Sequence, residues 1–235
     1  MQVVILAGGL GTRLRPLTLT VPKPMMPIKG RPFLEYQLAW VRRFEFSRVL
    51  LLTGYLGEQI ESHFQDGRRW DLSIAYSRES SPLGTAGALK QAASKLEDRF
   101  LLLNGDTYLP IDYRAMCCSF RQGQDVGVMA VCHMDDGHSV NNVALSENGQ
   151  VSHYAKEGGA RLTHVAAGAY IFDRVILEQI PERVPYSLEI DLTPALIATG
   201  LIRGYPTSER FYDIGSAETL RVADQFLTSK VVPSW

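Results

Sequence analysis

The chain has 235 residues, 46% of them hydrophobic, enough to form one large domain that buries roughly 70–75% of the surface of its unfolded chain. Its formal net charge of −1 excludes a general electrostatic attraction to nucleic acid or to an anionic membrane. We therefore predict a single domain over residues 1–235 with neither of those partners, in which any affinity for phosphate comes from a local site.

The N-terminal residues and the cysteines give no indication of export. The apolar run Val3–Ala7 is too short to span a bilayer and lacks the basic residues that open a signal peptide. The three cysteines are an odd number, and Cys117 and Cys118 are adjacent, which suits neither a disulfide framework nor a zinc site. We predict a cytoplasmic protein whose cysteines are free thiols or small buried apolar residues.

The first half of the chain alternates strand-like and helix-like segments. The strand-like segments are continuously apolar and bounded by turn residues, the pattern of strands that are covered on both faces. Strands that alternate with helices predict an α/β fold with a doubly wound, mostly parallel sheet. The predicted strands are Val3–Ala7, Arg48–Thr53 and Arg99–Leu103, and the predicted helices are Pro32–Phe44, Gly57–Phe64 and Thr85–Leu96.

The second half has several strand-like segments with few helical residues between them, so we expect antiparallel additions to the sheet. A last strand near Tyr212 is expected to run into a helix over Ser216–Leu227, and the tail Val231–Trp235 is expected to be untethered. The other predicted strands of this half are Val126–Val131, Asn142–Leu145, Val151–Tyr154 and His164–Phe172.

The loop after the first strand has the composition of a phosphate-binding loop. Ligands bind at the carboxyl ends of strands in parallel sheets, and glycine lets backbone amides approach an anion closely. Thr12 adds a hydroxyl donor and Arg13 a planar cation suited to phosphate oxygens. The loop comprises Leu6, Ala7, Gly8, Gly9, Leu10, Gly11, Thr12 and Arg13.

Lys23 lies between Pro22 and Pro24, which stiffen the backbone and lower the cost of presenting the lysine to a phosphate. A flexible surface turn is the alternative interpretation of the loop. A P-loop sequence is absent, and Leu14 stands where the dinucleotide fingerprint needs its third glycine. These differences disfavour a P-loop kinase and a nicotinamide dehydrogenase.

Two aspartates are candidates for metal binding. Asp106, in Asn104-Gly105-Asp106, follows a predicted strand and therefore lies at the same sheet edge as the glycine loop. Asp213 lies in an otherwise uncharged Phe-Tyr-Asp-Ile-Gly context, at a strand end before a turn. Magnesium typically takes one or two protein carboxylates together with phosphate oxygens. The alternative for each aspartate is a turn or helix-capping role.

These motifs resemble the sugar nucleotidyltransferase family, and the resemblance covers nearly the whole chain. It implies a Rossmann-like nucleotide-diphospho-sugar transferase fold and the joining of a nucleoside triphosphate to a sugar 1-phosphate with release of pyrophosphate. It further implies that Asp106 and Asp213 hold Mg²⁺ and that Arg13, Lys23 and Asp106 are catalytic. The motifs are Leu6–Thr18, Ser81–Gly87, Leu103–Asp106, Ser187–Asp191 and Tyr212–Gly215.

The same resemblance implies a set of nucleotide-binding residues. At the position of Glu79 the family contacts the edge of the nucleobase. A carboxylate accepts both the N1 hydrogen and the amino group of guanine, whereas a glutamine would suit thymine or uracil, so Glu79 favours GTP. A solvated loop carboxylate is the alternative for Glu79. The implied nucleotide-binding residues beyond the glycine loop are Glu79, Pro82, Gly84, Thr85, Asn104 and Gly105.

The match weakens on the sugar side. The family often shows Glu-Lys where this chain has Ala155 and Lys156, and only the lysine carries over, although Glu157 could replace the glutamate if the register slips by one. An Asn-Ala-Gly element keeps only Gly168, and Asn142 stands where a glycine is expected. Glu189 is a candidate acceptor for a sugar hydroxyl or, alternatively, a carboxylate favoured at a helix N-terminus. The predicted sugar-phosphate residues are Asn142, Lys156, Gly168 and Glu189.

Among the family's substrates, the resemblance is strongest to short D-glycero-α-D-manno-heptose 1-phosphate guanylyltransferases that use GTP. Mannose 1-phosphate is the next candidate, and glucose 1-phosphate with dTTP or UTP and N-acetylmuramic acid 1-phosphate with UTP stay open. A non-catalytic nucleotide-binding regulatory subunit is the alternative from another class, and a phosphocholine-type cytidylyltransferase is disfavoured by the Pro-Leu-Gly-Thr-Ala-Gly segment. The apolar tail leaves a homo-oligomer open.

Overall fold

The computed structural model describes residues 1–133, 140–159, 162–182 and 184–230, so the predicted tail Val231–Trp235 lies outside the described residues. Two compact units are formed. The N-terminal unit comprises residues 1–82, 103–108 and the stretch from Phe211 onward, and the central unit comprises residues 83–102 and 109–210. Each unit is described by itself, and the sequence-based expectation of a single domain stays a prediction.

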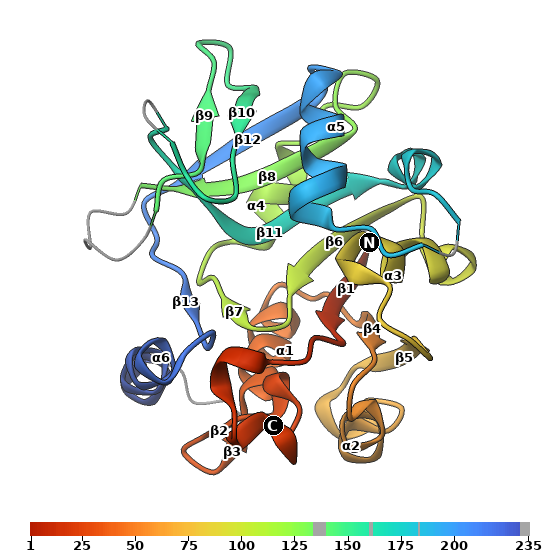
Figure 1. Ribbon diagram of the computed structural model, residues 1–235, viewed down its shortest axis with the longest axis vertical. Helices are drawn as coiled ribbons and strands as arrows, with labels where there is room; N and C mark the ends of the chain where they lie inside the picture. The colour runs from red at the N-terminus through yellow and green to blue at the C-terminus, as the bar shows by residue number, and fades with distance from the viewer. Residues whose placement is uncertain (134–139, 160–161, 183, 231–235) are drawn as a thin grey trace. The chain divides into compact units, whose positions relative to one another are not determined.

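The N-terminal unit contains three parallel strands in the order β1 (Gln2–Ala7), β4 (Arg48–Thr53) and β5 (Ser73–Arg78), as seen in Figure 1. The first two are buried along almost their whole length, as their continuous apolar runs predict. Helix α1 (Phe33–Arg43) follows Pro32, and α2 (Gly57–Phe64) precedes β5. The strand–helix alternation predicted for this part of the chain is confirmed.

Smaller elements complete the N-terminal unit. Two short antiparallel pairs, β2 (Pro27–Ile28) with β3 (Arg31–Pro32) and β7 (Thr107–Tyr108) with β13 (Tyr212–Asp213), lead into or out of the larger elements. The last helix, α6 (Ala217–Lys230), packs its apolar face on a core that is shared with α1. That core contains Leu14, Met26, Ile28, Phe33, Tyr36, Tyr108, Ile214, Ala223 and Leu227.

The central unit is mixed. Its strands follow the order β12 (Ile202–Thr207), β8 (Gly127–Cys132), β11 (Val165–Asp173) and β6 (Arg99–Asn104), and the last two residues of β6 belong to the N-terminal unit. β11 is antiparallel to β8, as expected, whereas β12 runs parallel to β8. A separate antiparallel hairpin is formed by β9 (Val143–Leu145) and β10 (Val151–Tyr154).

The central unit also carries helices α3 (Gly84–Gln91), α4 (Tyr113–Cys118) and α5 (Thr193–Ala198), and a π-helical turn over Leu188–Leu192 precedes α5. The helix predicted over Thr85–Leu96 therefore ends earlier, at Gln91, and a separate short turn covers Ala93–Lys95. The two short helices α4 and α5 and the strand β12 were not predicted.

The predicted free thiols are confirmed. Cys117 is half-buried, Cys118 is exposed and Cys132 is buried, and none forms a disulfide. Burial and the neighbouring Cys118 raise the pKa of the Cys117 thiol to about 11, so it is protonated and unreactive at neutral pH.

In the part of the chain that the structure describes, no helix combines the length and the apolar character needed to cross a bilayer.

Candidate active site

The conformation of the glycine loop in the N-terminal unit is held by a hydrogen bond from Thr18 to Gly11. β1 ends at Ala7, and Gly11 adopts a left-handed conformation with φ of 60°. The buried Thr18 hydroxyl donates a hydrogen bond to the Gly11 carbonyl over 2.8 Å, and a side chain at Gly11 would place its Cβ 2.8 Å from the Thr18 methyl carbon. A residue without Cβ is therefore required at Gly11. A Cβ at Gly9, in contrast, would find no described atom within 4 Å, so the loop backbone is accessible there.

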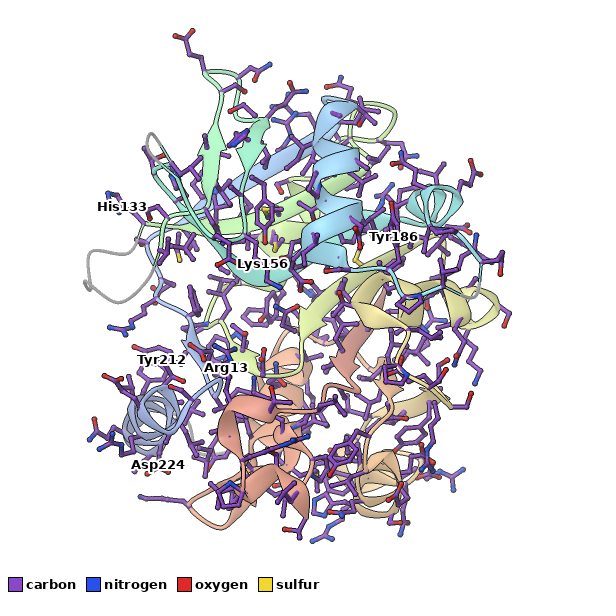
Figure 2. All side chains as sticks on the ribbon, viewed as in Figure 1. Arg13, His133, Lys156, Tyr186, Tyr212 and Asp224 are labelled. Atoms are coloured by element: carbon purple, nitrogen blue, oxygen red, sulfur yellow. The ribbon has the colours of Figure 1, made fainter. Side chains whose placement is uncertain are left out.

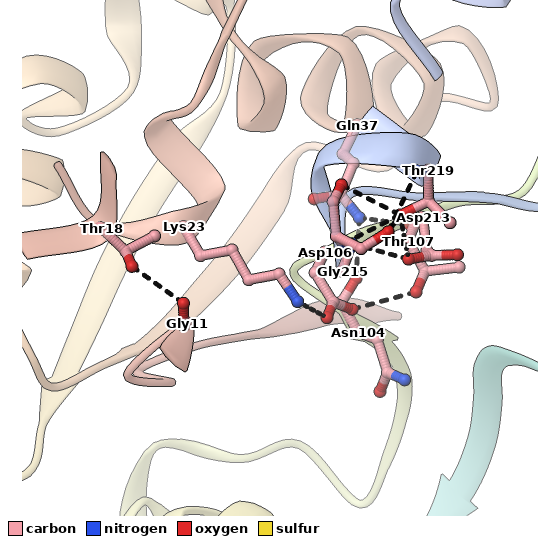
Figure 3. Close-up of polar contacts among 11 residues, drawn as sticks. Gly11, Thr18, Lys23, Gln37, Asn104, Asp106, Thr107, Asp213, Gly215 and Thr219 are labelled. Atoms are coloured by element: carbon pink, nitrogen blue, oxygen red, sulfur yellow. Dashed lines mark hydrogen bonds and ion pairs between the residues drawn. The ribbon is translucent and has the colours of Figure 1, made fainter. Parts of the chain in front are cut away.

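Two cations come from the same loop region but differ in burial. Arg13 is exposed in the turn Thr12–Leu14, and a Cβ at Gly215 would lie 3.0 Å from its Nη2 atom. Its guanidinium forms no ion pair with any described residue, so it is available to a phosphate. Lys23 is buried, with 9% of its surface exposed, and its ammonium forms an ion pair with Asp106. The ion pair holds the Lys23 ammonium against Asp106, one of the two candidate metal ligands (Figure 3).

The turn that carries Asp106 is held from both sides. The Gly105 amide donates to the Leu6 carbonyl over 3.0 Å, and a Cβ at Gly105 would lie 2.2 Å from that oxygen. From α1, the buried Gln37 side chain donates from Nε2 to the carbonyls of Asn104 and Thr107, over 2.8 and 2.7 Å. Figure 3 shows Gln37 reaching this turn. These contacts fix the backbone on both sides of Asp106.

The second aspartate is brought beside the first by strand pairing. Asp213 on β13 is paired with Thr107 on β7, and the Ile214 amide donates to the Asp106 carbonyl over 2.9 Å. The Asp213 oxygen Oδ1 accepts hydrogen bonds from the Gly215 amide over 2.6 Å and from the Thr219 hydroxyl over 3.0 Å. Both aspartates therefore lie in one turn region (Figure 3), and the two hydrogen bonds to the Asp213 carboxylate are both made to Oδ1.

These residues fit a magnesium ion. Among the described residues, no group of three or more His, Cys, Asp or Glu side chains forms a metal cage. Magnesium does not need one, since it usually takes one or two carboxylates and completes its shell with water and substrate phosphates. The buried Oδ1 atom of Asn104, next to this turn, also lacks a hydrogen-bond partner. Asp106 and Asp213 are the two oxygen donors that such an ion would bind.

Glu79 lies against the glycine loop. Its amide donates to the Thr53 carbonyl at the end of β4 over 2.9 Å. A Cβ at Gly54 would lie 2.6 Å from the Glu79 Oε1 atom, and a Cβ at Gly8 would lie 3.1 Å from the same atom. The half-buried Glu79 carboxylate therefore lies close to two glycines, Gly8 of the loop and Gly54. Pro82, a predicted nucleotide-binding residue, is exposed and is the last residue of the first segment of the N-terminal unit.

The N-terminal unit therefore gathers the predicted phosphate, metal and base residues: Leu6, Ala7, Gly8, Gly9, Gly11, Thr12, Arg13, Lys23, Glu79, Pro82, Asn104, Gly105, Asp106 and Asp213. The other predicted residues, namely Gly84, Thr85, Asn142, Lys156, Gly168 and Glu189, belong to the central unit.

Within the central unit, Asn142 and Gly168 are part of the framework. The Asn142 carbonyl oxygen Oδ1 accepts a hydrogen bond from the Ala166 amide over 2.9 Å. Gly168 is buried with φ of 72°, in the stretch of β11 where the pairing with β8 shifts register. Lys156 is exposed in the turn after β10 and forms no ion pair within the described ranges, so its ammonium is available to an anion (Figure 2).

Glu189 is tied to Thr85. The Thr85 hydroxyl donates to the Glu189 Oε2 atom over 3.0 Å, and the Ser187 hydroxyl donates to the same atom over 2.9 Å. The charge of Glu189 affects two tyrosines. Burial first, and then the Glu189 charge, raise the pKa of Tyr154 to about 12, and the same two causes raise the pKa of Tyr170. Both phenols are therefore neutral, hydrogen-bonding groups at physiological pH.

Sequence reasoning missed three residues that hold the others in place: Thr18, Gln37 and Thr219. Thr18 ends the first motif but was given no role of its own, and Gln37 and Thr219 are single polar residues outside the motifs. The one available signal is Gln37, a long polar side chain among the apolar positions of α1, where it is buried with 3% of its surface exposed. A buried polar group needs hydrogen-bond partners, so such a position indicates a nearby unpaired backbone.

Comparison with known proteins shows the family and the fold of this chain. The family model described as nucleotidyl transferase matches residues 2–230. The chain belongs to the nucleotidyl transferase family. The structure is similar to HddC from Yersinia pseudotuberculosis, solved in complex with GMP-PN, with a TM-score of 0.84 and 30% identity over 96% of this chain and 99% of that one. This similarity confirms the predicted fold class.

Two curated relatives of this nucleotidyl transferase are each 32% identical to it. One is the mannose-1-phosphate guanylyltransferase of Mycobacterium tuberculosis, matched over 100% of this chain and 66% of its own length. The other is the D-glycero-alpha-D-manno-heptose 1-phosphate guanylyltransferase of Aneurinibacillus thermoaerophilus, matched over 97% and 98%. The chain thus spans about two thirds of the mycobacterial relative and nearly all of the other.

Proposed function

We propose that this chain is a sugar-1-phosphate guanylyltransferase that converts GTP and D-glycero-α-D-manno-heptose 1-phosphate into the GDP-sugar and pyrophosphate. The observation that carries the proposal is the ion pair between Lys23 and Asp106, beside Asp213 and the glycine loop. Cations and paired carboxylates at a phosphate loop are the groups that nucleotidyl transfer needs, because the reaction depends on positioning and on neutralising charge.

In the proposed mechanism, a phosphate oxygen of the sugar 1-phosphate attacks the α-phosphorus of GTP in line. The new P–O bond forms as the bond to the leaving pyrophosphate breaks, and no covalent enzyme intermediate is involved. Arg13 and Lys23 neutralise charge on the transferred and leaving phosphates, and the loop amides orient them. Asp106 and Asp213 would hold Mg²⁺, which supplies Lewis-acid stabilisation of the phosphate oxygens when bound.

For the base, Glu79 supports guanine. Its carboxylate can accept two hydrogen bonds from the guanine edge, and it lies against Gly8 of the loop. The GMP-PN in the similar HddC structure supports the same choice. The nucleotide assignments of Pro82, Gly84 and Thr85 rest on the motif resemblance and stay proposals.

For the sugar, the heptose relative that matches this chain over 98% of its own length supports D-glycero-α-D-manno-heptose 1-phosphate. Mannose 1-phosphate is the second candidate, since it is the substrate named for the mycobacterial relative. Asn142, Lys156, Gly168 and Glu189 are the proposed sugar-phosphate residues, and the exposed ammonium of Lys156 is the proposed partner of the sugar's phosphate.

The test is pyrophosphate release with Mg²⁺ across GTP, dTTP, UTP, CTP and ATP, each paired with heptose, mannose and glucose 1-phosphates. Strong release that needs both GTP and a manno-configured phosphate would support the proposal. Release only with a pyrimidine triphosphate would refute the role of Glu79 and retain the chemistry. Silence across the panel, with nucleotide still bound, would favour a non-catalytic regulatory subunit.

Two further expectations stay predictions: a cytoplasmic location and, through the apolar tail, a homo-oligomer. Size-exclusion chromatography with light scattering measures the mass in solution, and a mass of one chain would contradict the second expectation.

A further inference from the structure

The Thr85 hydroxyl makes two hydrogen bonds to the segment that carries Glu189. Its hydroxyl donates its single hydrogen to the Glu189 Oε2 atom over 3.0 Å and accepts a hydrogen bond from the Leu188 amide over 2.7 Å. Because a hydroxyl has only one hydrogen to donate, that donor is committed to Glu189. The side chain of Thr85 therefore acts on the segment that carries Glu189.

The Ser187 hydroxyl completes the arrangement. It donates to the same Oε2 atom over 2.9 Å and accepts from the amides of Glu189 and Ile190, both over 3.2 Å. Two hydroxyl donors on one carboxylate oxygen fix the orientation of the whole group, since hydrogen bonds to a charged acceptor are the stronger kind. The Oε1 atom of Glu189 makes no hydrogen bond within the described ranges and is left as an oriented acceptor.

The backbone around Thr85 is rigidly joined to the segment before Glu189. The Tyr186 amide donates to the Leu83 carbonyl over 2.8 Å, and the Tyr186 carbonyl accepts from the amides of Ala86 and Gly87 over 2.9 and 3.1 Å. Gly84 has φ of 73°, and a Cβ there would lie 2.6 Å from the Tyr186 carbonyl oxygen. Tyr186 is labelled in Figure 2. The distance between Thr85 and Glu189 is therefore set by backbone contacts.

The surroundings of Glu189 suit a hydroxylated ligand. The carboxylate is half-buried, and the two tyrosines that sense its charge, Tyr154 and Tyr170, are both neutral at physiological pH. A fixed, partly desolvated carboxylate oxygen with neutral phenols nearby is complementary to a sugar hydroxyl, which donates one hydrogen and accepts others.

We propose that Thr85 and Ser187 are positioning residues that orient the Glu189 carboxylate so that its Oε1 atom accepts a hydrogen bond from a hydroxyl of the sugar phosphate. This inference rests on the proposed function and deepens it. It assigns the Thr85 side chain a supporting role in sugar recognition.

The test compares Thr85→Val with wild type, because valine keeps the shape and removes the hydroxyl. We expect KM for the sugar phosphate to rise roughly 10- to 100-fold, the factor typical of a hydrogen bond to a charged group, with KM for GTP changed less than about twofold. Thr85→Ser restores the hydroxyl and should restore KM. A rise in KM for GTP with an unchanged KM for the sugar phosphate would overturn the inference.

A matched control is Thr199→Val in the same unit. The Thr199 hydroxyl also donates to a carbonyl, that of Leu196, and accepts from an amide, that of Leu201. This variant removes the same chemical group at the end of α5 and should leave both KM values unchanged. Thermal unfolding of all variants shows whether Thr85→Val folds, and a double variant with Glu189→Gln should show little further loss, whereas additive losses would contradict a shared role.

Calorimetric binding of the sugar phosphate separates this inference from the proposed function. If wild type binds the sugar phosphate but releases no pyrophosphate, the catalytic proposal fails, and weaker binding by Thr85→Val would still support the positioning role. Equal binding by wild type and Thr85→Val, or no binding by either, would overturn the inference.

Discussion

The two units hold their functional groups in different ways. In the N-terminal unit, the charged groups are held by backbone and by each other: Lys23 pairs with Asp106, and strand pairing places Asp213 beside that turn. In the central unit, Glu189 is held by the hydroxyls of Thr85 and Ser187, and Lys156 is exposed. The candidate phosphate and metal residues of the N-terminal unit all match the family pattern. In the central unit, Ala155 and Asn142 depart from that pattern.

Under the proposed function, the phosphate chemistry uses a turn that backbone contacts fix. Recognition of the sugar, under the same proposal, uses a carboxylate that two hydroxyl groups hold in place. The predictions below test that contrast, beginning with the largest expected effect.

Replacing Lys23 with alanine should lower kcat by about 10²–10³-fold, comparable with the loss of one stabilising donor in other active sites. Steady-state pyrophosphate release measures this, and circular dichroism monitors the fold. Lys29→Ala is the matched control, because Lys29 is exposed in the turn between β2 and β3 and should be silent. Turnover like that of wild type in Lys23→Ala would refute the catalytic role.

Replacing Gln37 with leucine should weaken divalent-metal binding by about 10–100-fold, the usual effect of losing a residue that supports a metal ligand. Two carbonyls beside Asp106 lose their donor in this variant, so the turn loosens. Titration with Mn²⁺, followed by electron paramagnetic resonance, measures the affinity in the presence of GTP.

The control for Gln37 is Tyr36→Phe on the same helix. It removes the hydrogen bond from the Tyr36 hydroxyl to the Ile28 carbonyl and should cost about 1 kcal/mol of stability without changing metal affinity. Equal loss of metal affinity in both variants would mean that Gln37 supports only the helix.

Replacing Asn142 with alanine should lower the free energy of unfolding by about 1 kcal/mol, because the Ala166 amide loses its acceptor. Urea denaturation measures the change. If stability is unchanged while KM for the sugar phosphate rises, Asn142 serves the ligand and not the framework, and the contrast between the two units sharpens.

The smallest expected effect concerns His164. Burial, and then the neighbouring His133, lower the pKa of His164 below its ordinary value of 6.5. The unfolded chain therefore takes up a proton first as the pH falls, so this contribution to stability is present above pH 6.5 and is lost on acidification. Urea denaturation between pH 7 and pH 5 should show a shallower decline in His164→Gln than in wild type. Parallel curves would contradict this.

The sequence predicted the bounds of several elements closely. The segments Arg48–Thr53, Gly57–Phe64 and Val151–Tyr154 have the predicted bounds, because turn residues lie near their ends. β12 was not predicted, because Gly204 and Pro206 interrupt its pattern. Pro206 is tolerated there because β12 is the edge strand of its sheet, next to β8.

The candidate site residues come from motifs and from the segment that follows the first motif. Arg13, Asp106 and Asp213 belong to motifs, Lys23 follows the first motif, and the structure places all four in one unit. Gln37 and Thr219 were not assigned to the site. The polar Gln37 among apolar positions of α1 indicates a buried hydrogen bond but does not reveal its distant partner, and a threonine near a helix start has no local pattern that does so.

The N-terminal unit is built from three separate segments of the chain, and this affects how it folds during synthesis on the ribosome. Synthesis runs from the N-terminus, and the stretch from Phe211 that carries Asp213 and α6 is the last of its three pieces to emerge. A nascent chain stopped before Phe211 lacks one of the two carboxylates and also the Ala223 and Leu227 side chains of the shared core. The second proposed metal ligand and the final core packing are therefore acquired together, only when this segment has been translated.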